Sequence, residues 1–312
     1  MDSIENSVSN AILLKPEENV LIICDKPRER IAKMFSEVCE KLGAEVSLVR
    51  MNVREETKRE PPKPIVAAMK HSDLVLGITT RSLTHTEAVR MAKKTGARVA
   101  TMPGITDEVF PALGVNYKKM AKFCKKVAKF YKKVREIKVE ARLGTNLILG
   151  CRGREVQIDD GILNHRGSLH NLPAGEVGVA PLENSANGRV IFDICAVGVE
   201  KIKVPIEIWV RKGKIIKISG KSEAKKFKHI IEKSDKNAKT LCEFSIGTNS
   251  SARLIGRVLN DEKALGTCHV AFGDNLSIGG KNRSKTHLDG VIKSPTIWFD
   301  NKLIMKNGRF VD

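Results

Sequence analysis

Five residues in the second half of this chain carry the side chains that bind divalent metals. Glu176 lies in NLPAGEVGVAP, Glu243 in TLCEFSIGTN and His269 in GTCHVAFGDN, while His287 and Asp289 lie in SKTHLDGVI. Carboxylate oxygens and imidazole nitrogens are the usual ligands of zinc, manganese, cobalt and iron(II). In an extended chain, side chains two apart project from the same face, roughly 6–7 Å apart along the strand. The pattern predicts a metal site.

The surroundings of these residues favour the same interpretation. Each lies in a run rich in apolar residues and glycine. A charged group is costly to bury unless it is paired or coordinated, and a bound cation would supply the compensation. The residues alone leave alternatives open, because a buried glutamate can pair with a lysine and a buried histidine can be an ordinary hydrogen-bonded core residue.

Further polar residues lie close to these blocks in the sequence. They are predicted to contact substrate or to orient the metal ligands through hydrogen bonds. For the arginine, a surface salt bridge is an equal alternative. This supporting set comprises Glu262, Asn275, Lys281 and Arg283.

The elements that must position these residues fall into two parts with different patterns. In the first half, apolar runs at 19–25, 45–51, 73–79 and 97–103 alternate with amphipathic helical stretches. This alternation predicts a parallel sheet with helices on both faces. Neither GxGxxG nor a P-loop motif follows any of the strands. We therefore expect residues 1–140 to form a Rossmann-like α/β scaffold without phosphate-binding loops.

The second half changes to short strands separated by turns. One helix, at 221–235, interrupts the strands. A chain of 312 residues is long for one hydrophobic core. The predicted fold class is therefore α/β, with an amino-terminal parallel-sheet domain followed by a β-rich α+β domain at 141–312 that binds the metal and performs catalysis.

The net charge of +19 raises the question of an acidic partner. Its densest source is the run at 117–142, whose apolar residues recur at helical spacing, so the pattern predicts a helix with one lysine-rich solvated face. No nucleic-acid-binding motif accompanies it, which disfavours a nucleic-acid partner. A non-enzymatic basic binding protein is retained as an alternative function.

Cysteine usage and hydropathy bear on the compartment. The seven cysteines are scattered singly without a CxxC pair, which predicts reduced thiols, mostly buried. No secretory signal pattern and no run of about 18 apolar residues is present. We expect a cytoplasmic protein with no membrane partner.

The metal-site blocks, in their order along residues 165–310, resemble those of the aminopeptidase T and aminopeptidase S family of leucyl aminopeptidase-like metallopeptidases. The blocks are NLPAGEVGVAPLENSANGRVIFD, EFSIGTN, SARLIGRVLNDEKALGTCHVAFGDN and HLDGVI. The resemblance implies a hydrolase that removes N-terminal residues from peptides with two divalent ions, zinc, cobalt or manganese. It also implies a homodimer.

Carried over residue by residue, the resemblance assigns Glu176, Glu243, His269, His287 and Asp289 as metal ligands. It implies a bridging and catalytic role for Glu243. Glu262 resembles a nearby family glutamate, although its spacing to His269 differs. Two metals lower the pKa of a bridging water and polarise the scissile carbonyl, so that hydrolysis needs few other groups.

One departure from that family favours a second relationship. The peptidases carry a tyrosine shortly after the histidine that matches His269, whereas the tyrosines here are Tyr117 and Tyr131, both upstream. The sequence is also distantly similar to 2,5-dihydroxypyridine 5,6-dioxygenases, which hold a single iron(II). Their ligand set of two histidines and one carboxylate is matched by His269, His287 and Asp289. A mononuclear Fe(II) ring-cleaving dioxygenase is therefore the alternative enzyme.

Overall fold

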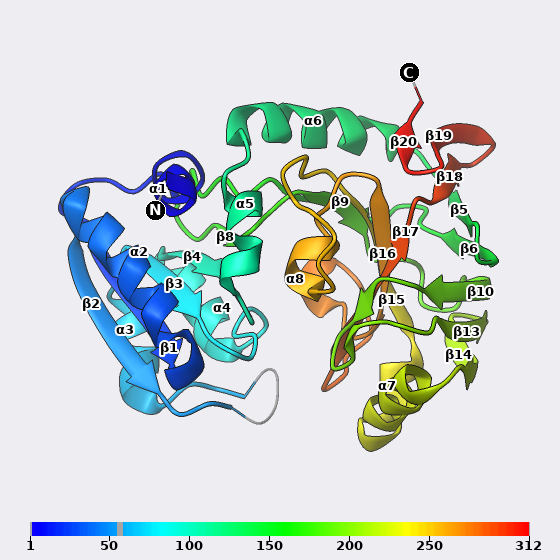
Figure 1. The fold of residues 1–312 in the computed structure, drawn as a ribbon, viewed down its shortest axis with the longest axis horizontal. Helices are drawn as coiled ribbons and strands as arrows, with labels where there is room; N and C mark the ends of the chain where they lie inside the picture. The colour runs from blue at the N-terminus through cyan, green and yellow to red at the C-terminus, as the bar shows by residue number, and fades with distance from the viewer. Residues whose placement is uncertain (1, 55–58, 312) are drawn as a thin grey trace. The chain divides into compact units, whose positions relative to one another are not determined.

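A computed structural model describes residues 2–54 and 59–311 (Figure 1). The chain divides into two compact units. Unit 1 comprises the chain up to Ala121 together with Asp159–Ala174, and unit 2 comprises Lys122–Ile158 together with the chain from Gly175 onward.

Unit 1 is built on a five-stranded parallel sheet in the order β2-β1-β3-β4-β8. Its strands are β1 (Asn19–Asp25), β2 (Glu45–Met51), β3 (Leu74–Ile78), β4 (Arg98–Thr101) and β8 (Leu169–Asn171). The helices are α1 (Asp2–Ser7), α2 (Glu29–Lys41), α3 (Lys63–Lys70), α4 (Glu87–Thr95) and α5 (Phe110–Leu113). A π-helical turn, η1 (Val8–Ile12), and two 3-10 turns, η2 (Lys26–Arg28) and η3 (Asp107–Val109), join them. The predicted parallel α/β sheet is confirmed.

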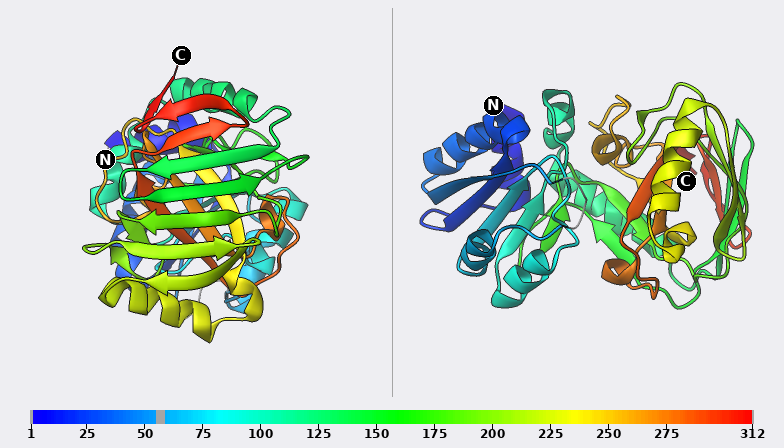
Figure 2. Two further views of the ribbon diagram at one scale, coloured as in Figure 1. Left: turned by 90° about the vertical axis from the view of Figure 1, so that its right-hand side faces the viewer. Right: turned by 90° about the horizontal axis from the view of Figure 1, so that it is seen from below.

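The core of unit 1 follows from the two-residue period of its strands. Leu21 and Ile23 of β1 pack with Met69 of α3 and Val89 of α4. Helix α2 contacts the same sheet, and Figure 2 shows helices on both of its sides. Strands β1, β3 and β4 are therefore buried on two faces, as is typical of parallel sheets, whereas β2 at the edge is largely exposed.

The division of the chain differs from the single boundary expected near residue 140. The chain leaves unit 1 at Ala121 and returns at Asp159 to add β8 to the edge of the parallel sheet. Strand β8 has only three residues, all partly buried. A strand this short has no detectable hydrophobic period, so the sequence pattern does not reveal it.

The prediction of one helix over residues 117–142 is correct up to Phe130 and wrong beyond it. Helix α6 (Tyr117–Phe130) ends well before the end of that run, and Glu136–Ala141 forms strand β5. Lys133 has a φ of 66°, which no helix continues through. Within α6, Met120, Cys124 and Val127 are buried and the lysines are exposed, as expected for an amphipathic helix.

Unit 2 contains two sheets that are largely antiparallel. An eight-stranded sheet has the order β14-β13-β10-β6-β5-β18-β19-β20, and a seven-stranded sheet has the order β12-β11-β17-β16-β15-β9-β7 (Figure 2). The strands not yet given are β6 (Thr145–Gly150), β7 (Val156–Asp159), β9 (Glu176–Val179), β10 (Asn187–Phe192), β11 (Cys195–Ala196), β12 (Glu200–Lys201), β13 (Ile206–Arg211), β14 (Lys214–Ser219), β15 (Leu241–Gly247), β16 (Thr267–Gly273), β17 (His287–Lys293), β18 (Thr296–Phe299), β19 (Lys302–Lys306) and β20 (Arg309–Phe310). Helices α7 (Ser222–Lys233) and α8 (Val258–Asp261) and the 3-10 turns η4 (Lys236–Lys239) and η5 (Leu276–Ile278) lie between them.

Aromatic side chains join the two sheets of unit 2. The ring of Phe192 in β10 lies 6.3 Å from that of Phe272 in β16, and 5.7 Å from that of Phe227 in α7. All three side chains are fully buried. The β-rich α+β architecture expected for the second half is therefore present, and its core fixes β16, the strand that carries His269.

Two further features concern cysteines and hydropathy. All seven cysteines are buried, and no disulfide joins any two of them. Across residues 2–54 and 59–311, no helix has the length and apolar character needed to cross a bilayer.

Candidate metal centre

The register of four neighbouring strands places the predicted ligands on one face of the seven-stranded sheet. Ala271 of β16 lies opposite Glu243 of β15 on one side and opposite Asp289 of β17 on the other. His269 is two residues from Ala271, and His287 is two residues from Asp289, so both project from the same face as their neighbours. Glu176 begins β9, opposite Gly247 of β15. The sheet thus gathers all five residues.

The side-chain donor atoms of these residues form a continuous chain. His269 Nε2 lies 3.5 Å from Glu176 Oε2 and 3.4 Å from Glu243 Oε1. His287 Nε2 lies 3.0 Å from Glu243 Oε2 and 3.2 Å from Asp289 Oδ1. Each oxygen of Glu243 therefore faces a different histidine.

Among the residues that the structure describes, three overlapping groups of donors lie close enough to hold an ion. They are Glu176–Glu243–His269, Glu243–His287–Asp289 and Glu262–His269–Asp289, each with its donor atoms within 4.8 Å of one another. The sequence predicted the members of the first two groups as ligands and placed Glu262 among the supporting residues.

The environment of His287 fits a cation between the side chains. Its Nδ1 lies 2.7 Å from the carbonyl oxygen of Asp274, an atom that can only accept, so Nδ1 carries a proton. In the neutral ring, Nε2 then presents a lone pair to the oxygens of Glu243 and Asp289. Three acceptors that converge in this way require either a proton or a metal ion between them. The donor set therefore fits a divalent metal.

Electrostatics in the metal-free cluster lead to the same conclusion. Burial opposes ionisation of Glu243, but hydrogen bonds from His269 and His287 outweigh it and hold the pKa of this carboxyl well below its usual range. Burial acts to lower the pKa of His269, yet the hydrogen bond to Glu243 and the charges of Glu176 and Glu262 raise it to about 9. Burial likewise opposes the charged form of His287, and Asp289 nevertheless holds its pKa well above the usual range. In metal-free protein, protons occupy the positions that a cation would take.

Glu243 is held in place by Ser245 of its own strand, and a glycine on the adjoining strand leaves room for that contact. Ser245 Oγ donates to Glu243 Oε1 at 2.8 Å. Ser245 lies opposite Gly178 of β9. A Cβ at Gly178 would lie 1.8 Å from that hydroxyl and 2.5 Å from the carbonyl oxygen of Phe244. A glycine is therefore required there for the Ser245 hydroxyl to reach Glu243.

Glu262 and Lys263 enter the cluster from the loop after α8. Lys263 Nζ lies 2.6 Å from Glu176 Oε1 and 3.1 Å from Glu262 Oε1. Burial raises the pKa of Glu262 to about 8; Lys263 opposes the rise, and the charges of Asp289 and Glu176 add to it. Lys263 is not among the residues predicted from the sequence. The only available signal was a lysine beside a glutamate in the short stretch NDEKALG.

Three of the predicted supporting residues have other surroundings. Asn275 is fully buried, and its side-chain amide hydrogen-bonds to backbone atoms. Its Nδ2 donates to Cys242 O at 3.3 Å, and its Oδ1 accepts from Asn282 N at 2.7 Å. Lys281 and Arg283 are exposed. Their described hydrogen bonds use backbone atoms, Lys281 N to Glu183 and Arg283 O from Asn237.

Tyr131 lies near the cluster but contacts backbone. Its hydroxyl donates to Val177 O at 3.0 Å, directly after Glu176 in β9. Burial raises the pKa of this phenol well above its ordinary value. Tyr131 therefore supports β9, and its hydroxyl is engaged with the strand that carries Glu176.

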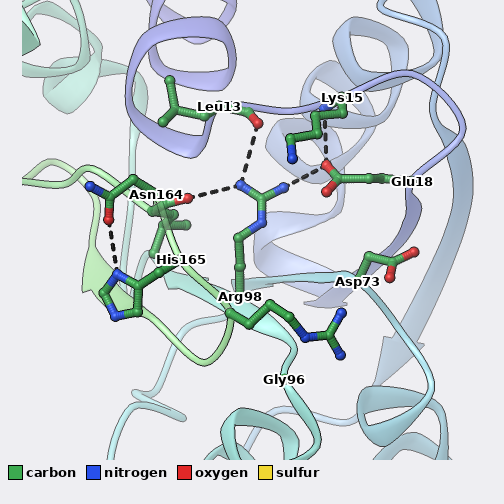
Figure 3. A pocket seen from close by; sticks show the side chains of 10 residues that line it. Leu13, Lys15, Glu18, Asp73, Gly96, Arg98, Asn164 and His165 are labelled. Atoms are coloured by element: carbon green, nitrogen blue, oxygen red, sulfur yellow. Dashed lines mark hydrogen bonds and ion pairs between the residues drawn. The ribbon is translucent and has the colours of Figure 1, made fainter.

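A separate pocket of about 380 Å³ lies within unit 1 (Figure 3). It is lined by charged residues near the starts of the parallel strands, including Glu18, Asp73 and Arg98. Arg98 donates to the carbonyl oxygen of Leu163 at 3.0 Å and pairs with Glu18 at 2.5 Å. The pocket is on the opposite edge of the sheet from the carboxyl ends of its strands, and the metal-ligand candidates are not among its lining residues.

A donor cluster of histidines and carboxylates on the face of a β-sandwich, in a chain that also carries a parallel α/β unit, defines a metal-dependent enzyme. The chain belongs to the family described as 2,5-dihydroxypyridine 5,6-dioxygenase, whose model matches residues 7–312. This is the family to which the sequence analysis assigned only a distant similarity.

Two solved structures share the whole fold. The 2,5-dihydroxypyridine dioxygenase of Pseudomonas putida KT2440 is 18% identical, with a TM-score of 0.82 over 99% of this chain and 96% of that one. AmpT from Thermus thermophilus is 15% identical, with a TM-score of 0.75 over 99% and 98% of the two chains. No curated protein matches the sequence. The resemblance to aminopeptidases is therefore supported at the level of fold, and the family assignment favours an oxidoreductase over a hydrolase.

We predict that metal binding releases protons. At pH 7.5 both His269 and His287 are protonated in metal-free protein, since their pKa values are raised to about 9 and well above the usual range. A metal ion requires the neutral imidazoles, so binding should displace about two protons, and affinity should rise with pH through the pKa of His269 near 9. Titration calorimetry with Mn(II) in buffers of different ionisation enthalpy measures the proton count. A count of zero would contradict direct ligation by the two histidines.

Proposed function

We propose that this protein is an Fe(II)-dependent dioxygenase that opens a dihydroxylated pyridine-type ring. The match of the family model to residues 7–312 carries this proposal. The donor set supports it, since two histidines and one carboxylate on a shared face are the ligands of non-haem iron(II) oxygenases.

His269, His287 and Asp289 are the residues that would hold the iron. Each histidine lies in a donor group with Asp289, but no group among the described residues contains both, so the two imidazoles would have to close on one ion. Iron(II), when bound, supplies the redox chemistry by which O₂ reacts with an aromatic ring. Strands β16 and β17 fix the three side chains by register, and Asp274 O orients His287 through Nδ1 at 2.7 Å. The protein thus sets the orientation of the donors before any ligand arrives.

Glu243 is our candidate for the group that accepts a proton from a substrate hydroxyl. Its two oxygens lie 3.4 and 3.0 Å from the two histidine nitrogens, so it borders the position of any ion that both histidines bind. Ser245 fixes its orientation through Oε1. A carboxylate placed beside a ring hydroxyl can take its proton as the ring reacts. The side chain of Glu243 is 13% exposed, so few waters compete for it.

The direct test is oxygen uptake with substrate. Protein purified without metal, loaded with Fe(II) and supplied with 2,5-dihydroxypyridine should consume O₂ and the aromatic chromophore in equal amounts. An oxygen electrode and the ultraviolet spectrum of the ring measure the two quantities. Protein treated with chelator serves as the control. An Fe(II)-loaded protein that leaves both O₂ and the ring unchanged would overturn the assignment to this substrate class.

A two-metal aminopeptidase is the second candidate, favoured by one observation. Glu243 directs one oxygen to each histidine, the arrangement expected of a carboxylate that bridges two ions. In that case the substrate would be a peptide, the ions would be zinc, cobalt or manganese, and the protein would form a homodimer. Release of N-terminal residues from short peptides by Co(II)- or Zn(II)-loaded protein, without oxygen uptake, would establish this candidate instead.

A further inference from the structure

Helix α6 carries six lysines and no acidic residue. Four of them, Lys122, Lys125, Lys126 and Lys129, are exposed and belong to unit 2. They lie three and four residues apart, so they project from one face of the helix, with about 5–6 Å between neighbouring Cβ atoms. The solvated face of α6 is therefore a continuous strip of cations.

The charge of this strip is not neutralised by neighbouring carboxylates. Lysines on two other helices have acidic partners one turn away, since Lys33 pairs with Glu29 at 3.3 Å and Lys228 pairs with Glu232 at 3.7 Å. Within residues 2–54 and 59–311, no ion pair involves a lysine of α6. Ions from solution must balance the strip, and a polyanion gains free energy when it releases such ions.

The strip continues onto the neighbouring edge of the eight-stranded sheet. The ring of Phe123 in α6 lies 5.0 Å from that of Phe310 in β20, and Lys302 Nζ of β19 lies 5.8 Å from the ring of Phe130. Figure 2 shows α6 beside these strands. The strip and this edge form one basic surface. The exposed cations that β19 and β20 add to it are Lys302, Lys306 and Arg309.

The opposite face of α6 is covered by the protein itself. Cys124 and Val127 are fully buried, and Cys124 Sγ lies 3.1 Å from Thr248 Oγ1. A helix that binds a membrane surface inserts its apolar face among the lipids. That face is not accessible in α6, so the surface fits a partner that is recognised by charge. Evenly spaced lysines complement a polymer with evenly spaced negative charges, and a nucleic-acid strand carries one phosphate about every 3.4 Å.

We propose that the basic surface of α6, β19 and β20 binds the phosphate backbone of a nucleic acid without regard to its base sequence. The sequence contains no nucleic-acid-binding motif, and this mode of binding requires none, because lysines contact phosphates and do not read bases. The inference goes beyond the proposed enzyme activity and does not depend on the metal centre.

The test measures binding of the whole protein to a fluorescein-labelled oligothymidine of about 20 nucleotides by fluorescence anisotropy. Affinity should fall steeply as salt rises from about 50 to 200 mM. Each lysine that neutralises a phosphate of a single strand contributes about −0.7 to the slope of log affinity against log salt, so four lysines contribute about −3. A variant with glutamine at all four positions should lose this part of the slope and bind about a hundred-fold more weakly at about 50 mM salt. Its substitutions are Lys122→Gln, Lys125→Gln, Lys126→Gln and Lys129→Gln.

Two control variants separate the basic surface from the net charge of the protein. Arginine at the same four positions keeps the charge and should bind as wild type does. The second control removes four exposed lysines on and beside α7, so its net charge equals that of the glutamine variant, and its affinity should stay within about three-fold of wild type. Its substitutions are Lys221→Gln, Lys225→Gln, Lys226→Gln and Lys233→Gln. Circular dichroism verifies that all variants are folded.

Three results would overturn the inference. The first is no binding of oligothymidine by wild type at about 50 mM salt, including the case in which the protein binds only vesicles of phosphatidylserine, which would indicate a membrane partner. The second is equal affinity of wild type and the glutamine variant of α6. The third is an equal loss of affinity in the α7 control, which would mean that net charge alone accounts for binding. None of these results bears on the metal centre or on the proposed function.

Discussion

Replacement of His287 by alanine is expected to abolish tight metal binding and to lower metal-dependent activity by at least about a hundred-fold, because even residues that only support a ligand contribute 10–100-fold. His287 Nε2 lies within 3.2 Å of both Glu243 and Asp289, and Asp274 O fixes its tautomer. Without the imidazole, only the carboxylates of Glu243 and Asp289 remain at this position, and the ion loses one of its three ligands. Calorimetric titration with Mn(II) or Fe(II) measures the loss of affinity.

His229→Ala is the matched control for this experiment. His229 is exposed on α7, and its removal should leave metal affinity and activity unchanged. Circular dichroism of both variants verifies that they are folded. If folded His287→Ala binds metal as tightly as wild type does, His287 is not a ligand, and both enzyme proposals lose a residue that they share.

Gly178→Ala is expected to lower the free energy of unfolding by about 2 kcal/mol or more, the usual cost of forcing an extra methyl into a packed interior. The added Cβ would lie 2.5 Å from the carbonyl oxygen of Phe244, a backbone atom that cannot move without disturbing the pairing of β9 with β15. It would also displace the Ser245 hydroxyl from Glu243. Metal affinity should therefore fall together with stability.

Thermal unfolding measures the first effect, with an expected decrease in Tm of about 4–8 °C for a domain of this size. Gly114→Ala is the control, since its φ is −81° and the nearest atom to an added Cβ is the Ser3 hydroxyl at 3.2 Å. Its Tm should change little. An unchanged Tm in Gly178→Ala would mean that the two strands separate easily at this point, and that Glu243 is not held by their packing.

The sequence predicts most of unit 1 because its strands are continuous apolar runs. The strands expected at 19–25 and 45–51 have the same bounds in the structure, and β3 and β4 lie within the other two expected segments. Burial on both faces makes β1, β3 and β4 visible without tertiary information. The helix at 221–235 is likewise found as α7.

The sequence-based predictions are wrong where the local sequence pattern favours one structure and tertiary contacts favour another. Residues 136–141 read as part of a basic helix, yet pairing with β6 and β18 makes them a strand. Strand β8 is defined only by its partner β4. The chain therefore returns to unit 1 at a place where the sequence indicates no boundary.

The sequence by itself determined which donor types are present, because carboxylates and imidazoles in apolar strands are costly without a cation. Only the tertiary structure decided which donors meet. Register places Glu243 and Asp289 on either side of Ala271, and the close passage over Gly247 brings Lys263 to Glu176. Lys263 and Glu176 are far apart along the chain, yet a charge acts over a few ångströms in space, so only the folded chain shows that they pair.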